Sequence, residues 1–332
     1  MEKGIEKLDD IINSKLMKLK ETPALLSMTE HQLKRTGSRM MARMSLLVCN
    51  AICGNNEKAL PLAAAMELFH NFSLIHDDII DEDELRRGQE AVWKKWGMQK
   101  AIVGGDCMLS LAYQSMIDVV KEWGMLEVSR KVLEAFNLLV KEVFEGECMD
   151  IDFEGRVDVS IKECLKMIEM KSGASVGFSS FCGAISAGAE NSIVNSYTTF
   201  GRNYGIALQI KNDLIDMTSP DLIGKGQNSD IKKRKKTIPV TYALESASGK
   251  DLEKLIRYYE KRQDEGVCEI PNIFKKVGAF KYAEEMASMY KSIAMTELKE
   301  IGKVVKSEGQ KCLYQTAAGD FNMGNTPLDF KV

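Results

Sequence analysis

The chain has 332 residues, of which 45% are hydrophobic and 28% charged, and 45 basic against 48 acidic residues leave a formal net charge of −3. This composition supports a sizeable core in one large domain or two ordinary ones. The near balance of charge gives no reason to expect a nucleic-acid partner, and no apolar run is long enough to form a transmembrane segment.

Helical periodicity runs along most of the chain, starting in an N-terminal helical segment at 1–30. Two further predicted helices, 44–54 and 60–75, are apolar on nearly all sides, which indicates buried helices. The others lie at 128–156, where apolar residues recur at three- and four-residue spacing, and at 159–190, 197–217 and 237–247. Strand alternation, repeats and linker composition are not seen. The sequence therefore predicts a single all-α domain over 1–332, with a loop-like tail at 316–332. Eight cysteines without a CxxC pair predict reduced thiols in a cytoplasmic protein.

The first acidic cluster follows an apolar helical run, in the stretch "LIHDDIIDEDELRRG". Asp77 and Asp81 lie one helical turn apart on the same face, and Asp78 lies about 100° round the helix. Neighbouring carboxylates repel each other unless bulk water or a cation separates them, and carboxylates are typical ligands of Mg²⁺. Arg86 and Arg87 could reach phosphate oxygens from the rim. The pattern is compatible with a solvated helix face or with a metal-bridged polyanion site.

A second cluster repeats this form in "QIKNDLIDM", where Asn212 and Asp216 share a helix face and Asp213 lies beside them. Lys225 and the basic run "KKRKK" at 232–236 follow it. Two acidic clusters on separate helices, each followed by cations, favour a shared polyanion over a solvated face.

Three further residues could join such a site. Lys171 follows an apolar helical run in "MIEMKSGAS", and Glu147 and Asp150 add acidic groups near a helix end in "EGECMDI".

Five ordered motifs carry a resemblance: "LIHDDIIDEDELRRG", "EGECMDIDFEGR", "KSGASVGF", "QIKNDLIDM" and "GKGQNSDIKKRKKTIPVTYAL". Together they resemble the trans-isoprenyl diphosphate synthases of the polyprenyl synthetase family, and most of all the archaeal-type geranylgeranyl and farnesyl diphosphate synthases. The resemblance runs from about Leu33 to Met295. It implies the isoprenoid synthase fold, with antiparallel helices around a deep central cavity, and a homodimer.

The resemblance also implies the chemistry. Magnesium and cations would neutralise the diphosphate of an allylic substrate, the C–O bond would ionise, and isopentenyl diphosphate would attack the carbocation. Carried over position by position, the residues assigned to catalysis are Asp77, Asp78, Asp81, Lys171 and Lys225. Those assigned to the allylic diphosphate also include Arg86, Asp150 and Lys235. Those assigned to isopentenyl diphosphate are Arg39, His70 and Arg87. Those assigned to magnesium are Asp77, Asp81, Asn212 and Asp216.

Product length in this family depends on side chains that precede the first aspartate motif and form the cavity floor. Phe72 and Phe69 occupy these positions, although both could be ordinary core aromatics. If Phe72 closes the cavity, the expected product is C20, within a range of C15 to C25.

The sequence departs from the family in several places. Ser38 and Met41 stand where the acceptor motif has a lysine and an arginine, and the loss of two charge-assisted hydrogen bonds would cost about 3–6 kcal/mol. Asn212 replaces an aspartate, Glu147 a glutamine and Arg234 a glycine.

Three functions therefore stay open. They are a diphosphate synthase, prenyl transfer to another acceptor, and a cyclase or a non-catalytic subunit. A class I cyclase motif starting at Asn212 would need residues that Asp216 and Pro220 do not supply.

Overall fold

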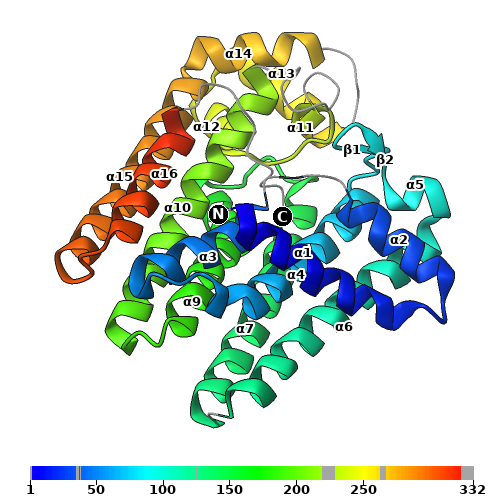
Figure 1. Cartoon of the computed structure of the whole chain (residues 1–332). Helices are drawn as coiled ribbons and strands as arrows, with labels where there is room; N and C mark the ends of the chain where they lie inside the picture. Colours follow the sequence, from blue (N-terminus) through cyan, green and yellow to red (C-terminus); the bar gives the residue numbers. More distant parts are fainter. Residues whose placement is uncertain are drawn as a thin grey trace.

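The computed structural model of the chain describes residues 2–34, 37, 39–124, 126–218, 229–261 and 267–322. Within these ranges the chain is almost entirely helical (Figure 1), which confirms the predicted all-α class. Two short strands, β1 (Leu85–Arg86) and β2 (Gln89–Glu90), form an antiparallel hairpin directly after the first acidic cluster.

The helices of the first half of the chain are α1 (Glu2–Leu16), η1 (Met17–Leu19), α2 (Pro23–Leu33), α3 (Met40–Cys53), η2 (Glu57–Ala59), α4 (Leu60–Ile80), α5 (Val92–Trp96), α6 (Met98–Trp123) and α7 (Leu126–Phe153). The helices of the second half are α8 (Ile161–Ile168), η3 (Glu169–Gly173), α9 (Ala174–Ser186), α10 (Asn191–Thr218), α11 (Ser229–Lys232), α12 (Ile238–Ser246), α13 (Gly249–Lys261), η5 (Val267–Glu269), α14 (Ile270–Val277), α15 (Ala279–Val304) and α16 (Glu308–Asn322).

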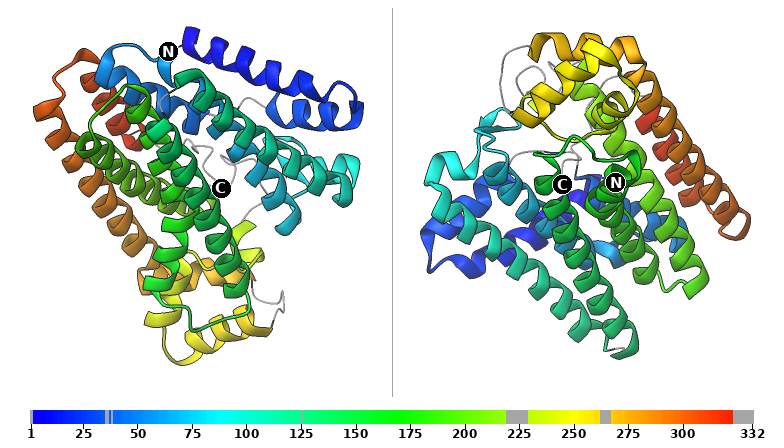
Figure 2. Two further views of the ribbon diagram at one scale, coloured as in Figure 1. Left: turned by 90° about the horizontal axis from the view of Figure 1, so that it is seen from below. Right: turned by 180° about the vertical axis from the view of Figure 1, so that it is seen from behind.

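The long helices form one bundle. α4 packs against α3 and α6, while α9 packs against α3, α7 and α10. α15 runs along α10, and α16 fits between α15 and α3. Figures 1 and 2 show α13 and α14 at one end of the molecule, and the C-terminal end of α6 with the N-terminal end of α7 at the other. Among the described residues, no helix is both long and apolar enough to cross a membrane.

One bundle helix changes geometry along its length. α8 begins at a capping box, in which Ser160 and Glu163 satisfy each other's backbone N–H groups. Its last turn continues directly into η3, a single π-helical turn, and then into α9. This π-helical turn contains Lys171, one of the predicted site residues.

The predicted tail differs from the structure. A loop was expected from residue 316 onward, but α16 continues as a helix to Asn322, so that expectation is wrong for 316–322. Leu313 and Ala317 of α16 are buried, and Tyr197 of α10 donates a hydrogen bond to Gln310 Oε1 at 2.6 Å. This packing holds a segment whose local sequence is a weak helix former. Residues 323–332 of the expected loop lie outside the described residues.

The core of the bundle is organised around Phe136 of α7, whose side chain is fully buried. Its ring lies 5.7 Å from Phe69 of α4, 4.8 Å from Tyr113 of α6 and 5.7 Å from Phe178 of α9, measured between ring centroids. One residue thus joins four helices in a single aromatic cluster.

Phe136→Ala is expected to lower the free energy of unfolding by about 3–5 kcal/mol, because it removes a ring that four helices share. Phe144→Ala is the matched control on the same helix, since Phe144 is about half exposed, and it should cost about 1 kcal/mol or less. Chemical denaturation of both variants measures the difference. Equal losses would contradict a central role for Phe136.

Candidate active site

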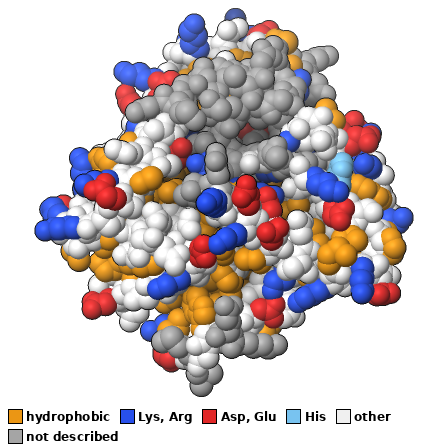
Figure 3. Space-filling view, in the orientation of Figure 1, with side chains coloured by type: hydrophobic (Ala, Val, Ile, Leu, Met, Phe, Trp, Pro, Cys, Tyr) orange, Lys and Arg blue, Asp and Glu red, His pale blue; other side chains and the backbone are white. Residues whose placement is uncertain are grey.

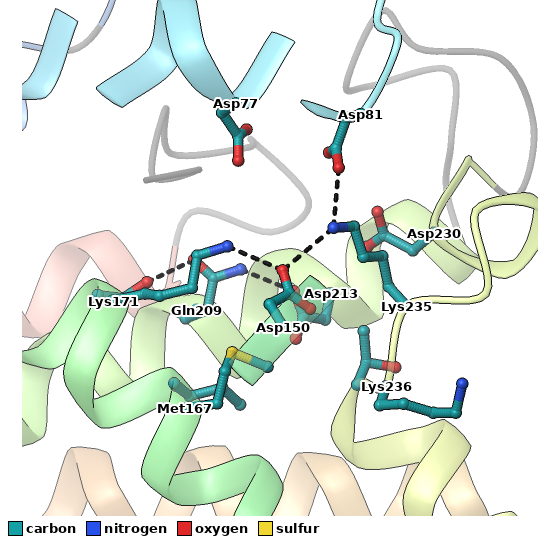
Figure 4. A pocket seen from close by; sticks show the side chains of 13 residues that line it. Asp77, Asp81, Asp150, Met167, Lys171, Gln209, Asp213, Asp230, Lys235 and Lys236 are labelled. Atoms are coloured by element: carbon teal, nitrogen blue, oxygen red, sulfur yellow. Dashed lines mark hydrogen bonds and ion pairs between the residues drawn. The ribbon is translucent and has the colours of Figure 1, made fainter. Parts of the chain in front are cut away.

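One pocket gathers charged residues from both predicted clusters (Figure 4). It encloses about 500 Å³ of empty space, part of it open to solvent. Charged side chains of both signs also gather in the middle of the face seen in Figure 3. The residues that line the pocket come from α4, α7, α8, η3, α10, α11 and the segment before α12, and they are Asp77, Asp81, Asp150, Met167, Ile168, Lys171, Ser172, Gln209, Asp213, Asp230, Lys235, Lys236 and Thr237.

The end of α4 supplies the first acidic group. Asp77 lies in its last turn and Asp81 is the C-cap residue, so both carboxylates reach the pocket as the spacing predicted. Asp78 is buried instead, and Arg86 Nε donates to its Oδ1 at 2.7 Å. Arg86 Nη2 lies 3.3 Å from Asp77 Oδ2. Burial lowers the pKa of the Arg86 guanidinium, but Asp78 and Asp77 raise it more, so Arg86 stays charged.

Two buried lysines meet on Asp150, opposite the aspartates of α4 (Figure 4). Lys171 Nζ lies 2.8 Å and Lys235 Nζ 3.2 Å from Asp150 Oδ2, and Lys235 also lies 2.8 Å from Asp81 Oδ1. Burial opposes the charge of both lysines, yet the surrounding carboxylates hold the pKa of each above its ordinary value. Burial also opposes the charge of Asp150, but the two lysines lower its pKa overall.

Glu147 adds a further carboxylate beside this group. Its Oε2 lies 2.6 Å from Lys171 Nζ. Burial raises the pKa of Glu147 to about 7 despite the lowering effect of Lys171, and the charges of Asp77 and Asp150 act in the same direction as burial. The glutamate that stands in place of the family's glutamine therefore titrates near neutral pH.

The second cluster reaches the pocket through a different residue than expected. Asp213 lines it and accepts a hydrogen bond from Gln209 Nε2 at 2.7 Å. Asn212 and Asp216 are buried and do not line it. Asp216 Oδ2 instead accepts a hydrogen bond from the backbone N–H of Asp230 at 3.0 Å. The two acidic helices do converge on one pocket, but the metal-binding roles of Asn212 and Asp216 stay predictions.

The donors fit magnesium in chemical type. Asp77 and Asp81 present carboxylate oxygens, which Mg²⁺ prefers, and Asp213 lines the same pocket. Among the described residues, however, no three His, Cys, Asp or Glu side chains lie close enough together to hold an ion by themselves. Phosphate oxygens would have to complete the coordination, as is usual for Mg²⁺.

The residues assigned to isopentenyl diphosphate do not line this pocket. Arg39 donates to Asp9 Oδ1 at 3.0 Å and to Glu67 Oε1 at 2.9 Å, so it joins α1 to α4. Met41 is fully buried and its sulfur accepts a hydrogen bond from Ser179 Oγ at 3.5 Å.

The other residues assigned to that substrate lie elsewhere. His70 is buried on α4, and Arg87 occupies the turn between β1 and β2 with φ 53°. Ser38 and Lys225 lie outside the described residues.

The two phenylalanines expected at the cavity floor lie in the aromatic core. The rings of Phe69 and Phe72 are 5.7 Å apart, and Phe72 also contacts His76 and Phe144. Neither lines the described pocket, and their role in product length stays a prediction.

Sequence reasoning missed several pocket residues, of which Gln209, Ser172 and Asp230 are examples. Ser172 Oγ donates to Gln209 Oε1 at 2.8 Å, which links η3 to α10. Gln209 lies four residues before Asp213, so helical spacing could have found it once Asp213 was known to face the pocket. Asp230 carried no such signal.

Comparison with known proteins is consistent with this geometry. Residues 22–277 match the family model described as polyprenyl synthetase. The chain is 37% identical over 264 residues to a short chain isoprenyl diphosphate synthase from Methanothermobacter thermautotrophicus, which covers 79% of this chain and 80% of that protein. It is 35% identical over 296 residues to a geranylgeranyl pyrophosphate synthase from Geoglobus acetivorans, covering 88% and 90% of the two chains.

Solved structures are similar to this chain in fold over nearly its whole length. A geranylgeranyl pyrophosphate synthetase from Pyrococcus horikoshii Ot3 has a TM-score of 0.81 and 30% identity, with 96% of this chain and 97% of that chain covered. A structure of another geranylgeranyl pyrophosphate synthase gives a TM-score of 0.85 at 29% identity, covering 95% and 96%.

Glu147 gives a testable pH dependence in the metal-free protein. Because its pKa is raised on folding, the stability linked to its protonated form is present below about pH 4.5 and is lost as the pH rises to about 7. As the pH rises from about 4.5 to about 7, the unfolding free energy of the wild type should fall by roughly 3 kcal/mol relative to that of Glu147→Gln. Any effect of the substitution that does not depend on pH adds a constant difference. Denaturation at several pH values measures it. Glu145→Gln, an exposed site on the same helix, is the control, and parallel curves for Glu147→Gln and wild type would contradict the assignment.

Proposed function

The chain belongs to the polyprenyl synthetase family. We propose that it is a prenyltransferase that condenses an allylic diphosphate with isopentenyl diphosphate to a longer trans-polyprenyl diphosphate, and that the reaction takes place in the described pocket. The observation that carries the proposal is the pair of buried lysines, Lys171 and Lys235, which line the same pocket as Asp77 and Asp81.

Lys171 and Lys235 would bind the diphosphate of the allylic substrate. Both ammonium groups are already positioned and charged, and Asp150 contacts both of them. Phosphate oxygens arriving in the pocket would share these cations with Asp150, through charge-assisted hydrogen bonds. Asp77 and Asp81 would hold Mg²⁺, which when bound supplies further positive charge to the leaving group.

Ionisation then follows from the charge of the pocket. As the allylic C–O bond breaks, both bonding electrons leave with the diphosphate, and Lys171 and Lys235 stabilise that developing charge. Met167 and Ile168 form an apolar part of the wall and limit the access of water to the carbocation. The double bond of isopentenyl diphosphate attacks the cation, and the resulting carbocation passes a proton to an oxygen of the released pyrophosphate, which restores a carbon–carbon double bond.

Condensation with isopentenyl diphosphate is favoured over transfer to another acceptor, because the relatives are named as diphosphate synthases. We propose that His70 and Arg87 bind the acceptor diphosphate, as the resemblance to the family implies for these positions. Arg39 is engaged with Asp9 and Glu67. A C20 product, limited by Phe72, also remains a proposal.

We further propose a homodimer that uses the outer face of α6. Ile102, Val103 and Ile117 are exposed on this helix, and exposed apolar side chains gathered on one element are typical of protein interfaces. A cytoplasmic location is proposed from the cysteines, because the eight thiols form no disulfide in the structure.

The decisive experiment incubates the protein with Mg²⁺, allylic diphosphates of several lengths and labelled isopentenyl diphosphate, and analyses the products. The wild type should incorporate label into longer prenyl diphosphates. Asp77→Asn and Asp81→Asn should each lower kcat/KM by about 10²-fold or more, whereas the exposed control Asp158→Asn should behave as wild type. Full activity in either pocket variant would overturn the assignment. Pyrophosphate release without incorporation would instead support another acceptor.

Val103→Glu should shift the protein from dimer to monomer in analytical ultracentrifugation, because it places a charge in the centre of the proposed interface. Ile293→Glu, at another exposed apolar position on α15, is the control and should leave the assembly unchanged. A wild type that sediments as a monomer would reject the dimer.

A further inference from the structure

Lys171 is carried by the only π-helical turn within the described residues. η3 spans Glu169–Gly173 between α8 and α9, and four of its residues are buried. Lys171 and the adjacent Ser172 both line the pocket. π-turns are rare, and they are frequently found at functional sites, where they change the direction of the side chains they carry.

Two glycines, one on α7 and one on α10, pack directly against this turn. A Cβ on Gly146 of α7 would lie 2.9 Å from Lys171 Cγ, 3.0 Å from Met170 Cβ and 3.1 Å from the backbone nitrogen of Lys171. A Cβ on Gly205 of α10 would lie 2.8 Å from the carbonyl oxygen of Ser172, 3.1 Å from Gly173 Cα and 2.9 Å from Val176 Cγ2 of α9. A side chain at either position would therefore force atoms of the π-turn to shift.

The close approach of α7 sets the distance between Lys171 and its partners. Gly146 immediately precedes Glu147 and lies one turn before Asp150, so all three belong to the part of α7 that faces the π-turn. The ammonium of Lys171 can therefore reach Glu147 at 2.6 Å and Asp150 at 2.8 Å while it remains buried. A wider separation of the two helices would move this cation away from the carboxylates and from the pocket.

We propose that Gly146 and Gly205 are positioning residues for diphosphate binding, because they clamp the π-turn that directs Lys171 into the pocket. The inference rests on the proposed function insofar as the ligand is the diphosphate of the allylic substrate. Misplacing a binding group by about 1 Å can cost up to 10²-fold in a preorganised site.

The test measures binding of inorganic pyrophosphate in the presence of Mg²⁺ by calorimetry. Gly146→Ala and Gly205→Ala should weaken binding by roughly 10-fold to 100-fold, and the KM for the allylic diphosphate should rise with them. Gly173→Ala is a milder change within the π-turn, since its Cβ would lie 3.2 Å from the carbonyl oxygen of Arg202. If the other two variants do not fold, weaker pyrophosphate binding by Gly173→Ala is the expected result, and unchanged binding would contradict the inference.

Gly201→Ala is the matched control. Gly201 lies one turn before Gly205 on α10, and its Cβ would lie 2.7 Å from the carbonyl oxygen of Val176 and 2.9 Å from Gly177 Cα, so it meets α9 and not the π-turn. It should lose stability as Gly205→Ala does, yet bind pyrophosphate within about twofold of the wild type. An equal loss of binding in the control would show that general destabilisation is the cause and would overturn the inference.

A double-mutant cycle separates positioning from other effects. If the glycines act through Lys171, Gly146→Ala should cause no further weakening in a Lys171→Met background. Additive losses would overturn the inference. Pyrophosphate binding that follows the predicted pattern, without any prenyl transfer, would contradict the proposed condensation alone. No pyrophosphate binding by the wild type would contradict both the clamp and the diphosphate site.

Discussion

The arrangement of the pocket depends on how the free-energy cost of burying its charged side chains is offset. Lys171, Lys235 and Asp150 are all nearly inaccessible to water, and each would be strongly destabilising there if left alone. They are tolerated because the carboxylate is shared between the two ammonium groups, and because Asp81 and Glu147 complete the charge balance. Carboxylates of the protein therefore engage both ammonium groups, and phosphate oxygens of a polyanion would share these cations with them.

That balance explains why the helices around the pocket approach so closely. A shared ion pair needs its atoms within about 3 Å, and lysine and aspartate side chains cannot adjust freely inside a close-packed bundle. Glycines let α7 and α10 come up against η3, and the wide turn of η3 presents both Lys171 and Ser172 to the same space. The positions of the site residues thus depend on backbone packing, and the aromatic cluster around Phe136 holds α7 against α4 and α9 further along the bundle.

The helical class and the convergence of the two acidic helices could be predicted from the sequence, because spacing along a helix reports which side chains share a face. Spacing does not report which of several faces looks into a pocket. Asn212 and Asp216 share a face, yet Asp213 is the residue that lines the pocket, since the packing of α10 against α9 and α15 fixes its rotation. Likewise Arg39 looked available for a ligand, and only the fold reveals that Asp9 and Glu67 engage it.

The burial of Met41 limits which side chains this position accepts. Its sulfur lies against Ser179 with no exposure to solvent, so an arginine here would place a guanidinium between α3 and α9. A buried charge without a partner is strongly destabilising. An arginine at this position is therefore compatible with the fold only if α3 and α9 change together.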